Sequence, residues 1–248
     1  MRQFTPQNQG FTLLEVLIAV AITAMIGVGA TQLLVNIIDS RRATDIRSEQ
    51  LASLQRFDMT LSRDIEQYIA RSIRDEYGET QPALQLNGSV YLFEFTHSGW
   101  RNSPLAKVPR TELQRVAYKL ERLNSDACTV ARERLASWGE VDAKGECLVR
   151  YFWPVLDRAN RSEPIAQMLL EQVDGLEIEV LAGKKALNNN ATSDQPTGMS
   201  NQQWHSTWPE IGYGEASTAH LMAVRWRLRL PSLGELERLW LLAGGAND

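Results

Sequence analysis

The side chains that could carry out chemistry are few and scattered. His97 precedes Ser98, but chain neighbours do not by themselves form a nucleophile–base pair, and no Gly-x-Ser-x-Gly turn occurs. His205 and His220 are isolated, and the sequence has no His-Glu-x-x-His, phosphate-binding or EF-hand motif. We therefore expect no catalytic residue, no metal site and no cofactor, and we interpret His97 and Ser98 as part of a structural turn.

One carboxylate does stand in an unusual place. Residues 11–38 are apolar apart from the single charge of Glu15, and about 20 such residues can cross a bilayer, so the pattern predicts a transmembrane helix over 11–38. A carboxylate inside such a helix costs roughly 2.5–3.5 kcal/mol at its centre and less near an end. It therefore needs a partner. The nearest candidate is an α-amino group at Phe11, of the same chain or of a neighbour; alternatively, Glu15 reaches the membrane interface without a partner.

The polar leader explains how Phe11 would acquire a free amine. The first ten residues are short and polar and end at Gly10. A secretory signal has its cleavage site after the apolar stretch, whereas here the order is reversed. Cleavage after Gly10 would leave the apolar helix on the mature chain, with Glu15 as its fifth residue.

Composition limits the class of protein further. The chain has 248 residues, 44% of them hydrophobic, and 26 Lys+Arg against 30 Asp+Glu, for a net charge of −4. This composition is ordinary for a folded protein, and the missing basic excess argues against nucleic acid as a partner. Two cysteines exclude a disulfide-dense scaffold and a four-cysteine zinc site.

The elements that would position these residues can be read from periodicity. No glycine or proline interrupts residues 30–77, and apolar residues recur there every three or four positions from Leu51, which predicts an amphipathic continuation of the helix over 39–77. A short helix is expected between Pro164 and Gly175. The fold class is then α+β, with one long helix packed on mostly antiparallel strands. Alternating residues predict strands near 91–95, 116–120, 148–153, 176–180 and 224–230, the last paired in a hairpin with 236–242.

The N-terminus resembles a known junction. Gly10 followed by Phe-Thr-Leu-Leu-Glu-Val-Leu-Ile-Ala at 11–19 is similar to the leader junction of type IV pilins and type II secretion pseudopilins. The resemblance implies a pilin-like fold and cleavage between Gly10 and Phe11 by the prepilin peptidase. It also implies N-methylation of Phe11, and a Glu15 that sets the assembly register by neutralising the amino terminus of an adjacent subunit.

Three internal segments, at 95–102, 150–158 and 170–181, resemble the J-type minor pseudopilins of the type II secretion system. The resemblance implies a protein that assembles and does not catalyse, at the tip of a pseudopilus that supports export of folded proteins across the outer membrane. The implied partners are the I-, K- and H-type minor pseudopilins, the prepilin peptidase, the inner-membrane assembly platform and exported substrate proteins.

The implied location is a single pass through the bacterial inner membrane, with the N-terminus in the cytoplasm and residues 78–248 as a periplasmic domain. Two stretches fall outside the resemblance: 123–146, which we interpret as an insertion, and the polar segment 183–219, which we interpret as a loop.

Cys128 and Cys147 flank the apparent insertion and would face an oxidising periplasm. A disulfide between them would contribute roughly 3 kcal/mol by loop-entropy reasoning. The alternative is two buried free thiols.

Two sets of residues are candidates for an interface. Arg225, Arg227 and Arg229 share one strand face, which is either a docking surface or a solvated face paired with acids such as Glu177 and Glu179. Trp204 and Trp208 stand in a polar segment, either as interface anchors or folded back onto the core.

Two other functions remain open from the sequence. The first is a minor pilin of a type IV pilus, which would share the leader and the fold. The second is a membrane-anchored periplasmic enzyme whose anchor is never cleaved.

Overall fold

The structure is a computed structural model that describes residues 12–75, 77–88, 90–99, 112–156, 162–184, 200–209 and 219–242. Gly10 and Phe11, the residues of the expected cleavage site, lie outside the described residues. The chain divides into two compact units, residues 1–51 and 52–248.

The first unit is the beginning of one long helix, α1 (Leu13–Glu66). Its side chains from residue 12 to 50 are exposed, apart from two that are half-buried, Ile46 and Gln50. An 18-residue stretch of α1 near the N-terminus is long and apolar enough to cross a membrane, and none of it is buried. This is the helix that the sequence predicts, with the apolar surface that lipid would cover.

The helix is shorter at its far end than we expected, because α1 stops at Glu66 and does not continue to residue 77. Just beyond it, the backbone bonds to strand β4 (Phe93–His97): Ile69 N donates to Thr96 O at 3.0 Å, and Ser98 N donates to Gln67 O at 2.9 Å. These bonds take up backbone groups that a continuing helix would need. Pairing with the sheet therefore overrides the helical periodicity of this segment.

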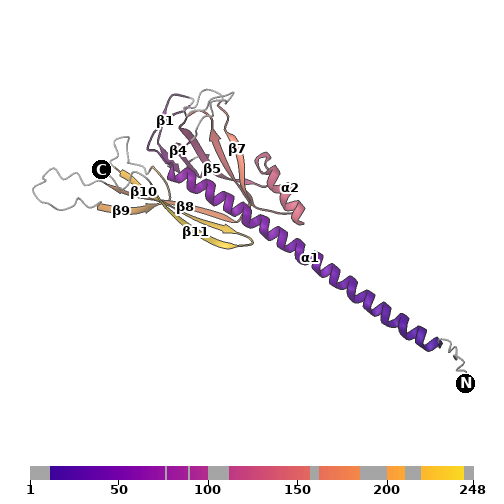
Figure 1. The fold of residues 1–248 in the computed structure, drawn as a ribbon. Coiled ribbons are helices and arrows are strands. Elements are labelled where there is room, and N and C mark those ends of the chain that lie inside the picture. The colour runs from indigo at the N-terminus through magenta and orange to yellow at the C-terminus, as the bar shows by residue number, and fades with distance from the viewer. Residues whose placement is uncertain are drawn as a thin grey trace, which may run out of the picture. The chain divides into compact units, whose positions relative to one another are not determined.

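The second unit contains two antiparallel sheets, which confirms the α+β class (Figure 1). A five-stranded sheet has its strands in chain order, and a four-stranded sheet has the order β11-β10-β8-β9. The first sheet consists of β3 (Leu84–Leu86), β4, β5 (Gln114–Arg122), β6 (Glu146–Trp153) and β7 (Ile165–Val173); the second of β8 (Gly175–Lys184), β9 (Ser200–His205), β10 (Ala219–Leu230) and β11 (Gly234–Leu241); β1 (Ile73–Arg74) and β2 (Thr80–Gln81) form a separate pair.

The last turns of α1 lie against both sheets and share their core (Figure 1). Phe57, Leu61 and Ile65 recur at helical spacing and are at most 6% exposed. Trp226 of β10 joins the layers, since its ring centroid lies 6.1 Å from that of Phe57 and 5.3 Å from that of Tyr118. Burying each such large apolar side chain contributes roughly 1.5–3 kcal/mol. Among the described residues, this core includes none from 1–51.

The short helix expected between Pro164 and Gly175 is wrong, because these residues form β7. The strand pairs with β6, for example through Leu170 with Leu148 and Gln167 with Arg150. A short apolar run has no periodicity that separates helix from strand, and pairing with the neighbouring strand decides the outcome. The hairpin of β10 and β11 is confirmed, and its turn ends at Gly234, whose φ of 75° favours glycine.

The two segments interpreted as an insertion and a polar loop both contain regular structure. The first holds a 3₁₀ turn at Asp126–Cys128 and the helix α2 (Thr129–Trp138), which packs beside β7. The second holds β9, which pairs with β8. Cys128 and Cys147 form a disulfide with a Cα–Cα distance of 6.0 Å, which ties the start of α2 to β6.

Removing this disulfide should lower the stability of the second unit. The bridge closes a loop with a sequence separation of 19, so replacing both cysteines with serine should cost roughly 3 kcal/mol of unfolding free energy. The measurement is urea unfolding of residues 39–248 without reductant. Reductant should weaken the wild-type fragment to a similar extent and leave the double variant unchanged; equal midpoints for wild type and variant would mean that the bridge contributes nothing.

Candidate functional site

Glu15 takes part in a local hydrogen-bond arrangement at the start of α1. Its Oε2 accepts bonds from the backbone N of Thr12 at 2.9 Å and from Thr12 Oγ1 at 3.0 Å, and its own N donates to Thr12 Oγ1 at 3.3 Å. This is a capping box, in which the first residue and the third helical residue satisfy each other's free N–H groups. Within the described part of the chain, Glu15 Oε1 has no hydrogen-bond partner, so one oxygen is available to a group from outside.

A buried ionic cluster attaches the end of α1 to the five-stranded sheet. Asp64 of α1 is fully buried and accepts bonds from Arg150 Nε at 2.5 Å, Arg150 Nη2 at 3.1 Å and Tyr118 Oη at 2.7 Å. His97 Nδ1 lies 4.0 Å from Asp64 Oδ1. The bidentate pair and the tyrosine together compensate the cost of burying the carboxylate.

The titration of the cluster follows from its burial. Burial raises the pKa of Tyr118 well above its ordinary value, and the adjacent Asp64 carboxylate adds to this effect. Burial also lowers the pKa of His97, although Asp64 acts in the opposite direction, so the imidazole is neutral at pH 7. Burial lowers the pKa of Arg150, but Asp64 and Tyr118 together outweigh this effect, so the pKa is raised. The cluster therefore holds one carboxylate and one guanidinium as a neutralised pair.

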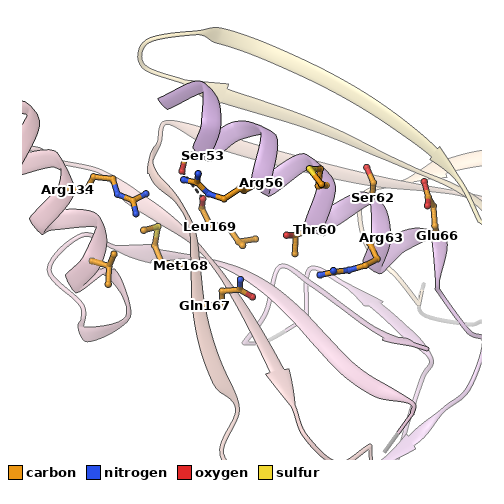
Figure 2. A pocket seen from close by; sticks show the side chains of 12 residues that line it. Ser53, Arg56, Thr60, Ser62, Arg63, Glu66, Arg134, Gln167, Met168 and Leu169 are labelled. Atoms are coloured by element: carbon orange, nitrogen blue, oxygen red, sulfur yellow. Dashed lines mark hydrogen bonds between the residues drawn. The ribbon is translucent and has the colours of Figure 1, made fainter. Parts of the chain in front are cut away.

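A groove runs between α1, α2 and β7, with a volume of about 660 Å³ (Figure 2). Met168 and Leu169 of β7 line it, and Arg56 and Arg63 of α1 and Arg134 of α2 border it. Its remaining lining residues are Ser53, Met59, Thr60, Ser62, Glu66, Val130 and Gln167.

Acidic residues pair with Arg225, Arg227 and Arg229, the three arginines that the sequence places on either a docking surface or a solvated face. Arg225 donates to Glu179, Arg227 to Glu177, Glu179 and Glu237, and Arg229 lies 3.6 Å from Glu235. The solvated-face alternative is therefore the one that the structure favours. No basic patch remains free there, and exposed pairs of this kind each contribute only about 0–1 kcal/mol.

The two tryptophans have different environments. The Arg225 guanidinium lies 4.2 Å from the ring centroid of half-buried Trp204, on the outer face of the four-stranded sheet. Trp208 is 8% exposed and belongs to the core, where its backbone pairs with Leu86. Of the two alternatives for Trp208, folding back onto the core is the one that the structure favours.

Sequence reasoning missed the Asp64 cluster, although two signals were present. Asp64 stands within the apolar stripe of α1, next to Ile65, and Arg150 shares a strand face with Leu148, which is fully buried. A charged residue at an inward position of each element indicates a buried pair. Within the described residues, no group of three or more His, Cys, Asp and Glu side chains is arranged to hold a metal ion.

The family model, the related sequences and the solved structure that match this chain all point to the same family. Residues 32–242 match the family model described as "Type II secretion system (T2SS), protein J", and residues 5–31 match the "Prokaryotic N-terminal methylation motif". The chain is 28% identical to type II secretion system protein J of Escherichia coli over 240 residues, 95% of this chain and 96% of that protein. It is 27% identical to the protein of the same name from Vibrio cholerae serotype O1, over 96% of this chain and 88% of that one.

Solved structures are also similar to this chain. One of them is a chain of the crystal structure of the GspK–GspI–GspJ complex from the type 2 secretion system of enterotoxigenic Escherichia coli. The TM-score is 0.50 and the identity 26%, over 79% of this chain and 98% of that one.

Proposed function

Because the chain belongs to the type II secretion system protein J family, we propose that this minor pseudopilin works in a complex at the tip of the periplasmic pseudopilus. Its proposed partners are the I-, K- and H-type minor pseudopilins. The tip primes assembly of the fibre and supports export of folded proteins across the outer membrane. Its role is assembly, not catalysis.

The observation that carries this proposal is the match of residues 32–242 to one family, together with two relatives that are similar to this chain over 96% and 88% of their length. The similar solved chain comes from a complex of GspK, GspI and GspJ, so I- and K-type subunits are the first partners to test.

The proposed topology places the N-terminus in the cytoplasm and residues 39–248 in the periplasm. The apolar part of α1 and the family fit single-pass anchoring in the inner membrane. A disulfide between Cys128 and Cys147 supports an oxidising compartment for the second unit. The methylation-motif match at residues 5–31 supports cleavage between Gly10 and Phe11 and N-methylation of Phe11 by the prepilin peptidase.

The proposed mechanism of assembly is the transfer of the apolar helix from lipid into the fibre, without a chemical reaction. The apolar helix holds the subunit in the bilayer until the assembly platform extracts it, and contacts with neighbouring helices then replace lipid. Glu15 keeps its capping bonds to Thr12 through Oε2, while Oε1 pairs with the Phe11 amine of an adjacent subunit. A carboxylate in an apolar surrounding gains most from a charged partner, which sets the register of assembly.

Complex formation tests the proposal. Residues 39–248 contain the whole core, so this fragment should co-elute with the soluble domains of the I- and K-type subunits of the same organism as one stable species. The soluble domains of type IV minor pilins serve as the matched control. Co-elution with the type IV minor pilins, and not with the I- and K-type domains, would favour the type IV pilus alternative.

A further inference from the structure

Strand β7 ends the five-stranded sheet with an edge that is open over half its length. Its only ladder partner among the described residues is β6. Ile165, Ala166 and Gln167 are exposed and Met168 is half-buried, whereas the second half of the strand is largely buried. At the boundary, Ser53 Oγ of α1 donates to Leu169 O at 3.4 Å and to Glu171 Oε1 at 2.8 Å, so α1 is in direct contact with the strand at the start of its buried half.

Two other edge strands of the described sheets, β3 and β11, are protected in ways that β7 is not. β3 has three residues, and Leu86 pairs with Trp208 beyond it. β11 carries Glu235, Glu237 and Arg238 along its exposed edge. Charged residues, short length and covering segments are the usual protection against pairing with another chain. The open half of β7, Ile165–Met168, has no charged residue, so it is suited to accept a further strand.

The groove beside this edge has the size of a short strand. Gln167, Met168 and Leu169 all line it although successive side chains of a strand point to opposite faces, so the groove borders the backbone edge itself. A residue in a packed sheet occupies roughly 160 Å³, from the strand rise and the two sheet spacings. The groove volume of about 660 Å³ therefore leaves room for a short extended segment of another chain.

The charge of the groove indicates the charge of the partner segment that would fit it. Arg134 is paired with Glu171, whose other hydrogen bond comes from Ser53. Arg56 and Arg63 are exposed on α1, and neither has an ion-pair partner in the part of the chain that the structure describes. Among its lining residues the groove has three arginines and one carboxylate, that of Glu66, so positive charge is in excess beside the apolar floor. Carboxylates of a partner complement this arrangement.

We propose that the groove between α1 and β7 is a docking site for an extended, acidic segment of a partner pseudopilin, which adds to the edge of β7 at Ile165–Met168. Backbone bonds to β7 supply the affinity, and carboxylates that reach Arg56 and Arg63 supply the selection. This inference rests on the proposed function, because the segment belongs to the I- or K-type subunit.

Amide hydrogen exchange in the complex of residues 39–248 with the I- and K-type domains tests the strand addition. Amides of Ile165–Met168 that point away from β6 should exchange about 10-fold more slowly in the complex than in the free fragment, because they gain backbone acceptors. A complex in which these amides exchange as fast as before would overturn the inference and leave the proposed function intact. Failure of the wild-type domains to associate at all would overturn both.

Charge reversal tests the acidic character of the segment. The double variant Arg56→Glu, Arg63→Glu should bind the I- and K-type domains about 10-fold more weakly or worse, and wild-type binding should weaken as salt is raised. The matched control is Arg71→Glu, Arg122→Glu, since both arginines are exposed and neither lines the groove. Both double variants should keep the wild-type unfolding midpoint. Equal affinities of the two double variants would overturn the role of Arg56 and Arg63.

Discussion

Replacing Asp64 with alanine should lower the free energy of unfolding of residues 39–248 by about 3–5 kcal/mol, the usual cost of removing one partner of a buried ion pair. The variant leaves Arg150 buried without its carboxylate and Tyr118 without the acceptor of its hydroxyl. Since small domains are stable by only about 5–15 kcal/mol, this single change removes a large share of the total. Urea unfolding monitored by tryptophan fluorescence measures it.

Asp58→Ala is the matched control on the same helix. Asp58 pairs with Arg238 at 3.0 Å, but both side chains are exposed, so this variant should lose no more than about 1 kcal/mol. The double variant Asp64→Leu, Arg150→Met should be more stable than Asp64→Ala, because no unpaired charge is left in the core. Similar losses in Asp64→Ala and Asp58→Ala would show that the cluster does not attach α1 to the sheet.

Replacing Glu15 with alanine should allow the leader to be removed and yet abolish incorporation into the pseudopilus. The cleavage site ends at Phe11, so the peptidase still has its junction, while the adjacent subunit loses the carboxylate that neutralises its amine. Mass spectrometry of the purified chain measures removal of the ten leader residues. Cross-linking to neighbouring pseudopilins in cells measures incorporation, and normal cross-linking of the variant would refute the register role.

Glu15→Gln separates the two roles of this side chain. The amide oxygen of glutamine can still accept the bonds from Thr12 that cap α1, but the side chain carries no charge. If charge pairing sets the register, the glutamine variant should fail as the alanine variant does. Full incorporation of Glu15→Gln would mean that the helix cap, and not the ion pair, is what assembly needs.

The parts of the fold that depend on local pattern could be predicted from the sequence. The unbroken apolar run at the start of α1 and the alternation within β10 are both visible in the sequence. The structure has a helix and a strand at these two places, as expected. The parts that depend on tertiary pairing could not. Residues 67–77 continue a helical stripe in the sequence, but Gln67 bonds to Ser98, and Ile69 bonds to Thr96 of β4. Residues 165–173 are apolar enough for either structure but pair with β6.

The candidate surfaces divide in the same way. The three arginines of β10 could be placed on one face from alternation, but their neutralisation depends on Glu235 and Glu237 of β11 as well as on β8, and cross-strand register decides that. The groove was not predicted at all, because it combines α1, α2 and an edge of β7 that the sequence did not show as a strand. Arg56 and Arg63 looked like ordinary residues of a solvated helix face.

The most direct test of the proposed role in type II secretion is to measure secretion from a strain of the native host that lacks this chain. We expect substrates of the type II system to accumulate folded in the periplasm of this strain, and the full-length chain to restore their appearance in the medium. Undiminished secretion from the deletion strain would contradict the proposed role.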